Sequence, residues 1–222
     1  MRPELAALID HTLLRPDAVR SDFVRLCDEA AHHGFATVCV NSTHVALCTS
    51  LLADCQVPIA ATVGFPLGAS SPAAKAAEAA RALGDGATEI DMVCPIFALK
   101  EGMLGPFVDE IRKVVDAADG AAVKVILETC LLSDDEKRRG AQWTREAGAA
   151  FVKTSTGFGA GGATEADVRL LRGEVGPNFG VKASGGIRDA ETADRMIAAG
   201  ANRLGTSAGV AIVTESGKGD RG

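Results

Sequence analysis

The chain has 222 residues, a length that suits one domain, and its 47% hydrophobic and 23% charged residues are close to the average for a soluble globular protein. A net charge of -6 and a pI of about 5.3 argue against nucleic acid and anionic membrane as main partners, and no apolar run approaches the length of a membrane span. The first residues, Met1 to Leu5, lack the apolar core of a signal peptide, so we expect a cytoplasmic protein.

The cysteines and histidines predict neither disulfides nor a metal site. The six cysteines include no C-x-x-C pair and show no regular framework, and most stand among apolar neighbours. We therefore expect reduced, packed thiols. A zinc site would need clustered Cys and His, which the four histidines do not supply, so no metal or other cofactor is predicted.

Short apolar runs that are typical of β-strands alternate along the chain with helical stretches. Strands are expected at residues 8–14, 35–41, 59–63, 88–93 and 123–129, around Lys153, around Lys182 and at 203–207. Helices are expected between a Ser21 cap and Gly34, at 44–52, 73–83 and 107–116, from a Ser133 capping box to residue 147, and at 164–172 and 191–199.

About eight strands, most of them followed by a helix, predict an α/β fold of the closed kind, a parallel eight-stranded TIM (β/α)8 barrel. This barrel should occupy residues 1–213 as a single domain. An open doubly wound sheet is the alternative, but it would normally have fewer strands and a phosphate-binding turn near its start. Residues 214–222 are polar and glycine-rich, and a loosely ordered, flexible tail is expected there.

Two lysines stand at matching places on what should be adjacent strands, near the carboxyl ends where the active sites of such barrels lie. They are Lys153 and Lys182. Adjacent strands are about 4.8 Å apart, so the amines can approach each other, and a second ammonium in a dry pocket lowers the pKa of its neighbour. One lysine can then form a Schiff base while the other is its electrostatic partner. The alternative is that one or both lysines reach water or pair with a carboxylate.

Asp91 is the acidic residue expected beside these lysines. Strand alternation places it on one face together with Glu89, inside the predicted barrel. In a Schiff-base mechanism such a carboxylate can carry protons, directly or through water, whereas its alternative role is a buried salt bridge. Lys124 stands near the start of its own strand, where a structural ion pair is at least as reasonable, and no catalytic role is assigned to it.

Glycines follow the strands that carry the two lysines and the last strand. Gly185, Gly186, Gly205 and Ser207 occupy the loops from which many barrels build a phosphate site, and Gly157 offers one more free N–H. Ordinary glycine-rich turns are the alternative. Residues 157–162 also fit G-x-G-x-x-G, but the acidic residue expected about 20 positions further on is absent, so we reject a dinucleotide site.

Six motifs, each weak alone, occur in a specific order: Asp10-His11-Thr12-Leu13-Leu14, Val38-Cys39-Val40-Asn41, Glu89-Ile90-Asp91-Met92-Val93, Lys124-Val125-Ile126-Leu127-Glu128-Thr129, Phe151-Val152-Lys153-Thr154-Ser155-Thr156-Gly157 and Val181-Lys182-Ala183-Ser184-Gly185-Gly186-Ile187-Arg188. Together they resemble the deoxyribose-phosphate aldolase family, from about Asp10 to Val210. The resemblance implies a metal-free class I aldolase that interconverts 2-deoxy-D-ribose 5-phosphate with acetaldehyde and D-glyceraldehyde 3-phosphate, in deoxyribonucleotide catabolism. The implied partners are a sugar phosphate and an aldehyde, and a homodimer is one expectation for the assembly.

The resemblance also implies roles for individual residues. Lys153 would be the Schiff-base lysine, Lys182 the second lysine that tunes it, and Asp91 the proton-transfer residue. Asp10 and Thr12 look like the supporting and substrate-contacting pair of the family. The phosphate loops would be formed by Gly157, Gly185, Gly186, Gly205 and Ser207.

Two departures from the family pattern concern the substrate and the proton. Paired serines often follow the final strand in this family, whereas Ser207 is followed here by Ala208, so one hydroxyl to the phosphate is absent. Some members use a tyrosine in the C-terminal tail, and this chain has no tyrosine. Two other functions stay open: a different Schiff-base barrel aldolase, and a catalytically silent barrel that binds a phosphorylated metabolite.

Overall fold

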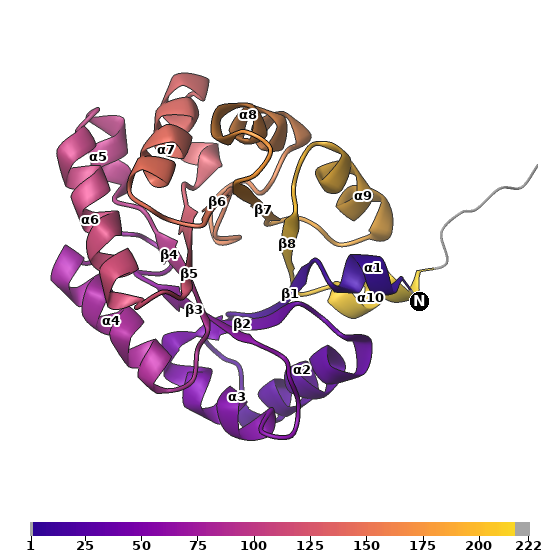
Figure 1. Ribbon diagram of the computed structural model, residues 1–222. Coiled ribbons are helices and arrows are strands. Elements are labelled where there is room, and N and C mark those ends of the chain that lie inside the picture. Colours follow the sequence, from indigo (N-terminus) through magenta and orange to yellow (C-terminus); the bar gives the residue numbers. More distant parts are fainter. Residues whose placement is uncertain (1, 216–222) are drawn as a thin grey trace, which may run out of the picture.

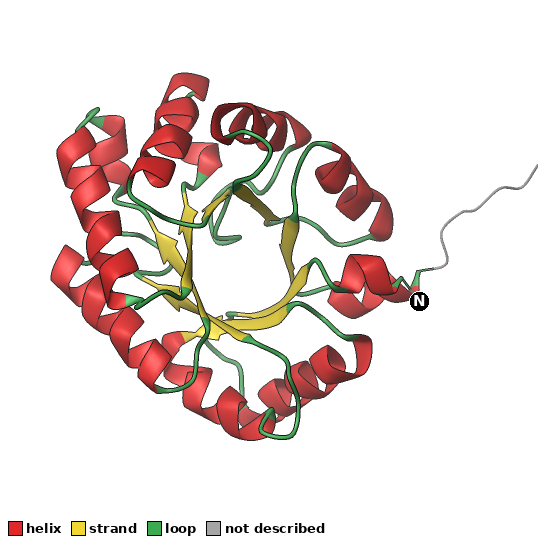
Figure 2. Cartoon of the chain, viewed as in Figure 1, coloured by secondary structure: helices red, strands yellow, loops and turns green. Residues whose placement is uncertain are grey.

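The computed structural model describes residues 2–215 and shows a closed parallel barrel in which each strand pairs with the next and the last pairs with the first (Figures 1 and 2). The predicted TIM barrel is confirmed. The strands are β1 (Ile9–Leu13), β2 (Thr37–Asn41), β3 (Ile59–Val63), β4 (Glu89–Val93), β5 (Ala122–Ile126), β6 (Phe151–Lys153), β7 (Gly180–Ser184) and β8 (Arg203–Thr206).

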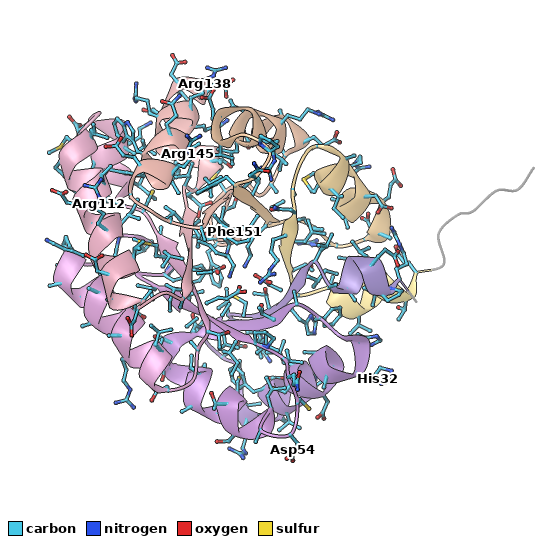
Figure 3. The ribbon with its side chains drawn as sticks, in the orientation of Figure 1. His32, Asp54, Arg112, Arg138, Arg145 and Phe151 are labelled. Atoms are coloured by element: carbon cyan, nitrogen blue, oxygen red, sulfur yellow. The ribbon has the colours of Figure 1, made fainter. Side chains whose placement is uncertain are left out.

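Helices surround this ring of strands on the outside (Figure 2). They are α1 (Pro3–Ala6), α2 (Arg20–His33), α3 (Val45–Leu51), α4 (Pro72–Gly84), α5 (Ile96–Lys100), α6 (Leu104–Ala117), α7 (Asp134–Glu146), α8 (Glu165–Val175), α9 (Ala190–Ala198) and α10 (Gly209–Thr214), with short 3-10 turns η1 (Ser42–His44) and η2 (Thr129–Leu131). The charged side chains of Arg112 and Arg138, labelled in Figure 3, lie on this outer layer.

Local capping explains most of the helix boundaries. The Ser133 hydroxyl accepts the Glu136 N–H while the Glu136 carboxylate accepts the Ser133 N–H, which is the predicted capping box at the start of α7. Gly34 ends α2 in the left-handed region, as predicted. The expected Ser21 cap is wrong: Val19 is the N-cap, two residues earlier, and α2 begins at Arg20. The Asp22 carboxylate accepts the Val19 N–H at 3.0 Å, because its side chain reaches back from inside the first turn.

Three short helices escaped sequence analysis because they span only four to six residues: α1, α5 and α10. Helix α10 extends through Thr214, and the Glu215 carboxylate accepts the Ala190 N–H at 3.0 Å. The first two residues of the predicted tail therefore belong to the barrel, and the rest of that tail lies outside the described residues. Within residues 2–215 no helix is both long and apolar enough to cross a membrane.

The barrel has an apolar layer outside its strands and a polar interior. Side chains that point from the strands towards the helices form one buried hydrophobic cluster, which includes Val38, Ile90 and Val125. Alternate residues point inward, and several of these are charged, whereas barrel interiors are usually filled by branched apolar residues. The outer layer therefore supplies most of the hydrophobic stabilisation, which leaves the interior available for chemistry.

Candidate active site

The centre of the barrel holds a carboxylate that receives three lysines. One Asp91 oxygen lies 2.6 Å from Nζ of both Lys153 and Lys182, and the other lies 2.8 Å from Nζ of Lys124. All four side chains are buried. The register pairs Lys153 directly with Lys182 across β6 and β7, so the matched positions seen in the sequence are neighbours in the fold.

A second group of charges lies next to this carboxylate. Asp10 on β1 accepts from Lys182 through one oxygen and from Arg203 Nε, at 2.6 Å, through the other. Arg203 also donates to both oxygens of Glu89 at 2.6 Å, and Lys124 Nζ lies 2.5 Å from Glu89. The predicted structural ion pair of Lys124 is thus present, but its partners include Asp91, which joins Lys124 to the central group.

The environment separates the protonation states of the paired lysines. Burial lowers the pKa of Lys153, and the nearby Lys182 charge adds to this effect, while the attraction of Asp91 opposes it. Burial also acts on Lys182, but the attraction of Asp10 and Asp91 outweighs it and raises the pKa of that lysine. Burial of Asp91 is likewise outweighed, by its three lysines, and its pKa falls well below the usual range. The arrangement favours a neutral amine at Lys153 beside a cation at Lys182.

A pocket of about 290 Å³ opens above this network at the carboxyl ends of the strands. Of the three lysines that contact Asp91, Lys153 is the one that lines this pocket, and it is only 3% exposed. Other predicted site residues line the same pocket: Thr12, Gly157, Gly185, Gly186, Gly205 and Ser207. Lys182, Asp91 and Asp10 do not line it and lie buried beneath. Asp10 therefore has the geometry of a supporting residue rather than of a direct substrate contact.

The glycines at the pocket have different physical reasons to be glycine. Gly157, Gly185 and Gly186 have φ between 81° and 87°, a region that side chains rarely adopt. A Cβ on Gly205 would lie 3.1 Å from Cε of Lys182, so that glycine also makes room for the lysine. The spacing of these glycines along the sequence does not distinguish a turn from a close packing contact.

The structure adds pocket residues that sequence reasoning did not assign. Two arginines, Arg15 and Arg188, line the pocket together with Phe158. Arg15 pairs with Asp17 at 2.8 Å. A cation beside glycine N–H groups suits an anionic ligand. Arg188 could have been assigned to the pocket from the sequence, because it directly follows Gly186-Ile187.

Glu128 is a further unassigned residue, and it anchors the loop after β6. It adopts a left-handed backbone conformation with φ 57°, and its carboxylate accepts the hydroxyl and the N–H of Thr156. The Thr156 hydroxyl in turn accepts the Phe158 N–H at 3.0 Å. A Cβ on Gly161 or Gly162 would lie 2.9 Å from Cys130 or 2.2 Å from the Gly185 carbonyl oxygen, so this G-x-G-x-x-G run reflects close packing.

Ala208, which stands where a second serine was expected, does not line the pocket that Lys153 reaches. It borders a neighbouring cavity of about 460 Å³, and its N–H donates to the Thr206 hydroxyl at 2.9 Å. Among residues 2–215 no group of three or more His, Cys, Asp or Glu side chains is placed to hold a metal ion. The carboxylates at the centre face ammonium and guanidinium groups instead.

Comparison with known proteins is consistent with this geometry. A family model described as DeoC/LacD family aldolase matches residues 5–215. "Deoxyribose-phosphate aldolase 1" of Bacillus licheniformis is 55% identical, and a deoxyribose-phosphate aldolase of Geobacillus sp. (strain WCH70) is 53% identical, each over 96% of both chains. The tetrameric deoxyribose phosphate aldolase structure from Aeropyrum pernix is 36% identical with a TM-score of 0.89, over 95% of this chain and 90% of that one. The chain belongs to the DeoC/LacD aldolase family.

Proposed function

We propose that this protein is a deoxyribose-phosphate aldolase that reversibly cleaves 2-deoxy-D-ribose 5-phosphate to acetaldehyde and D-glyceraldehyde 3-phosphate. The names of relatives that match almost the whole chain at more than 50% identity support this substrate. The observation that carries the mechanism is the position of Lys153, which lines the pocket while the cation of Lys182 and the carboxylate of Asp91 lie beneath it.

Lys153 begins the reaction as a neutral amine. Its nitrogen adds to the C1 carbonyl of the open-chain sugar, and the carbinolamine loses water to give an iminium. Asp91 lies 2.6 Å from both amines, so it can receive a proton from one and return it to the other without moving. Lys182 is charged before the reaction begins, and its charge opposes protonation of the neighbouring amine.

Cleavage uses the iminium as the electron sink. Acetaldehyde contains C1 and C2 of the sugar, so the bond that breaks is C2–C3, and its electron pair moves into the iminium to form an enamine. The C3 hydroxyl gives its proton to water in the pocket as the new carbonyl forms, and glyceraldehyde 3-phosphate leaves. Protonation of the enamine at C2 and hydrolysis of the resulting imine release acetaldehyde and return Lys153 to its free form.

The phosphate binds at the glycine-rich side of the pocket in this proposal. Gly157, Gly185 and Gly186 offer backbone N–H groups and have no side chains of their own, Ser207 adds a hydroxyl, and Arg188 adds a cation. Thr12, on β1 next to β8, contacts the sugar. Loss of the Arg188 charge should therefore raise KM for the phosphorylated sugar far more than KM for 2-deoxyribose itself.

Assembly and compartment are part of the same proposal. We propose a homodimer in the cytoplasm. Exposed apolar side chains on and near α5 and α6, among them Phe97, Met103 and Leu104, support self-association, and the Aeropyrum pernix relative is described as a tetramer. All six cysteines are free, which suits a reducing compartment. Light scattering on a size-exclusion column tests the dimer, and a monomer at micromolar concentration would contradict it.

Borohydride trapping tests the mechanism directly. Wild-type protein treated with acetaldehyde and sodium borohydride should gain one ethyl group, and peptide mass mapping should place it on Lys153. Lys153→Ala should neither be labelled at that site nor release acetaldehyde from 2-deoxyribose 5-phosphate. Label on another lysine would overturn the assignment. Binding of the sugar phosphate without acetaldehyde release would favour a catalytically silent barrel, and a panel of carbonyl compounds would reveal an aldolase for another substrate.

A further inference from the structure

A row of cations crosses three adjacent strands inside the barrel. Lys153, Lys182 and Arg203 are register partners on β6, β7 and β8. Their carboxylate partners are Asp10 on β1, the neighbour of β8, and Glu89 and Asp91 on β4, across the ring. The pairs that Asp91 makes with Lys153 and Lys182, and that Glu89 makes with Arg203, therefore run across the interior of the barrel and connect strands that are not paired with each other.

The numbers of opposite charges in this network do not match when every group is ionised. The network contains four basic side chains, namely Lys124, Lys153, Lys182 and Arg203, and three carboxylates, namely Asp10, Glu89 and Asp91. An unpaired charge inside a protein is costly, so one group in such a network tends to become neutral. Lys153 is the basic member that reaches the pocket, and it has one carboxylate partner, which it shares with two other lysines.

We propose that Arg203 and Glu89 are positioning residues that fix the charge balance of this network, so that it is neutral when Lys153 carries no proton. Neither residue lines the pocket. Arg203 holds Asp10 against Lys182, and Glu89 holds Arg203 and Lys124. Both thus act on Lys153 through other side chains. The inference rests on the proposed role of Lys153 as the imine-forming residue.

The site is shaped for a guanidinium. Arg203 donates from Nε to Asp10 and from Nη2 to Glu89, a divergent pair of bonds that a single ammonium cannot copy. Its Cζ lies 6.0 Å from the ring centre of Phe151, which lies inside the ring of strands in Figure 3. A Cβ on Gly180 would lie 2.2 Å from that ring, so Gly180 leaves room for Phe151.

The groups that face Lys153 from the surrounding strands limit which charges can act on it. Asp91 on β4 pairs with it, Lys182 on β7 lies beside it, and Cys39 on β2 approaches Asp91 at 3.9 Å with a thiol whose pKa is raised by burial. The rest of the network, Asp10 on β1, Glu89 on β4, Lys124 on β5 and Arg203 on β8, reaches it through Asp91 and Lys182. The Cys39 thiol stays neutral, so the count of lysines, arginine and carboxylates decides the balance.

Competitive acetylation measures the proton on Lys153 without relying on catalysis. Trace acetic anhydride reacts with neutral amines, and peptide mass spectrometry across a pH series gives the midpoint for Lys153 in each variant. Arg203→Gln removes a cation, so the midpoint should rise, whereas Glu89→Gln removes an anion, so the midpoint should fall. Each shift should be about one pH unit. The midpoint of the double variant should return close to the wild-type value. The midpoint of Arg203→Lys should also lie close to the wild-type value, because the lysine restores the cation.

A matched variant separates charge balance from structural damage. Glu110 forms a buried ion pair with Lys75 outside the network. Glu110→Gln should lower the melting temperature without moving the Lys153 midpoint. If Arg203→Gln does not fold, Glu89→Gln still decides the question, because a midpoint that stays or rises overturns the proposal. Shifts of both variants in one direction also overturn it. Failure of borohydride to label wild-type Lys153 would instead refute the proposed reaction and leave the acetylation result standing.

Discussion

The barrel buries lysines in two places, and only one of them resembles a catalytic site. Lys75, on α4, is fully buried and donates to the carbonyls of Gly68 and Val93 at 2.8 Å and to Glu110 at 2.5 Å. Lys153, on β6, is nearly as buried, but its carboxylate partner Asp91 is shared with two other lysines, and its side chain reaches the pocket.

The difference shows that burial alone does not prepare a lysine for chemistry. All three protons of the Lys75 ammonium have acceptors, one of which carries a full charge, so the cation is satisfied where it lies. Lys153 has one shared acceptor and stands in a network with a surplus cation. A buried lysine becomes a candidate nucleophile when its surroundings leave the ammonium poorly compensated and a pocket gives a carbonyl access to the nitrogen.

The largest expected effect is the loss of activity in Lys153→Met. The variant lacks the nucleophile, so kcat/KM for 2-deoxyribose 5-phosphate should fall on the order of 10⁴-fold or more. Its melting temperature should not fall, because the network loses its surplus basic group and keeps three cations with three carboxylates. Acetaldehyde-release kinetics and differential scanning calorimetry measure the two properties. A variant with a few per cent of wild-type activity would place the nucleophile elsewhere.

Lys75→Met should show the opposite pattern. Removing this ammonium leaves the buried Glu110 carboxylate without its partner, which should cost about 3–5 kcal/mol of unfolding free energy. The kcat of the folded enzyme should stay within about two-fold of wild type, because Lys75 does not touch the pocket. Urea unfolding followed by circular dichroism measures the loss. The double variant Lys75→Met/Glu110→Leu should recover much of it, and no recovery would mean that the carbonyl contacts, not the charge pair, determine stability.

Acid should destabilise the network at the centre of the barrel through Asp10. Burial of Asp10 is outweighed by Lys182, Lys124 and Arg203, which lower its pKa from 3.8 to about 2. Because that pKa is depressed on folding, its contribution of about 2 kcal/mol is complete above pH 4 and is lost as the pH falls through 2. Between pH 5 and pH 2, urea unfolding should show a smaller loss of stability for Asp10→Asn than for wild type. Equal losses would contradict the depressed pKa.

The sequence was sufficient for the barrel and for the pairing of Lys153 with Lys182, because alternating strands and helices, with a lysine at the same depth on successive strands, leave little freedom in register. It did not distinguish the two kinds of buried lysine. Lys75 stands in the alanine-rich stretch 73–83, where it looks like an ordinary helix former, and its burial depends on a loop that folds over it. The network role of Arg203 was also hidden, since Asp10 and Glu89 come from strands far away in sequence.

The smallest expected effect concerns the glycines that make room for each lysine. A Cβ on Gly205 would lie 3.1 Å from Cε of Lys182 and 3.0 Å from Cβ of Ser184, so Gly205→Ala should displace the lysine by a fraction of an ångström. Because proton transfer depends on that position, kcat should fall about tenfold, with about 1 kcal/mol of stability lost to overpacking. Gly64→Ala is the matched control: its Cβ would lie 2.6 Å from Cε of Lys75 at φ 62°, so stability should fall while kcat is retained. If both variants lost only stability, the position of Lys182 would not limit the reaction. Lys182 would then act only through the positive charge that it places beside Lys153.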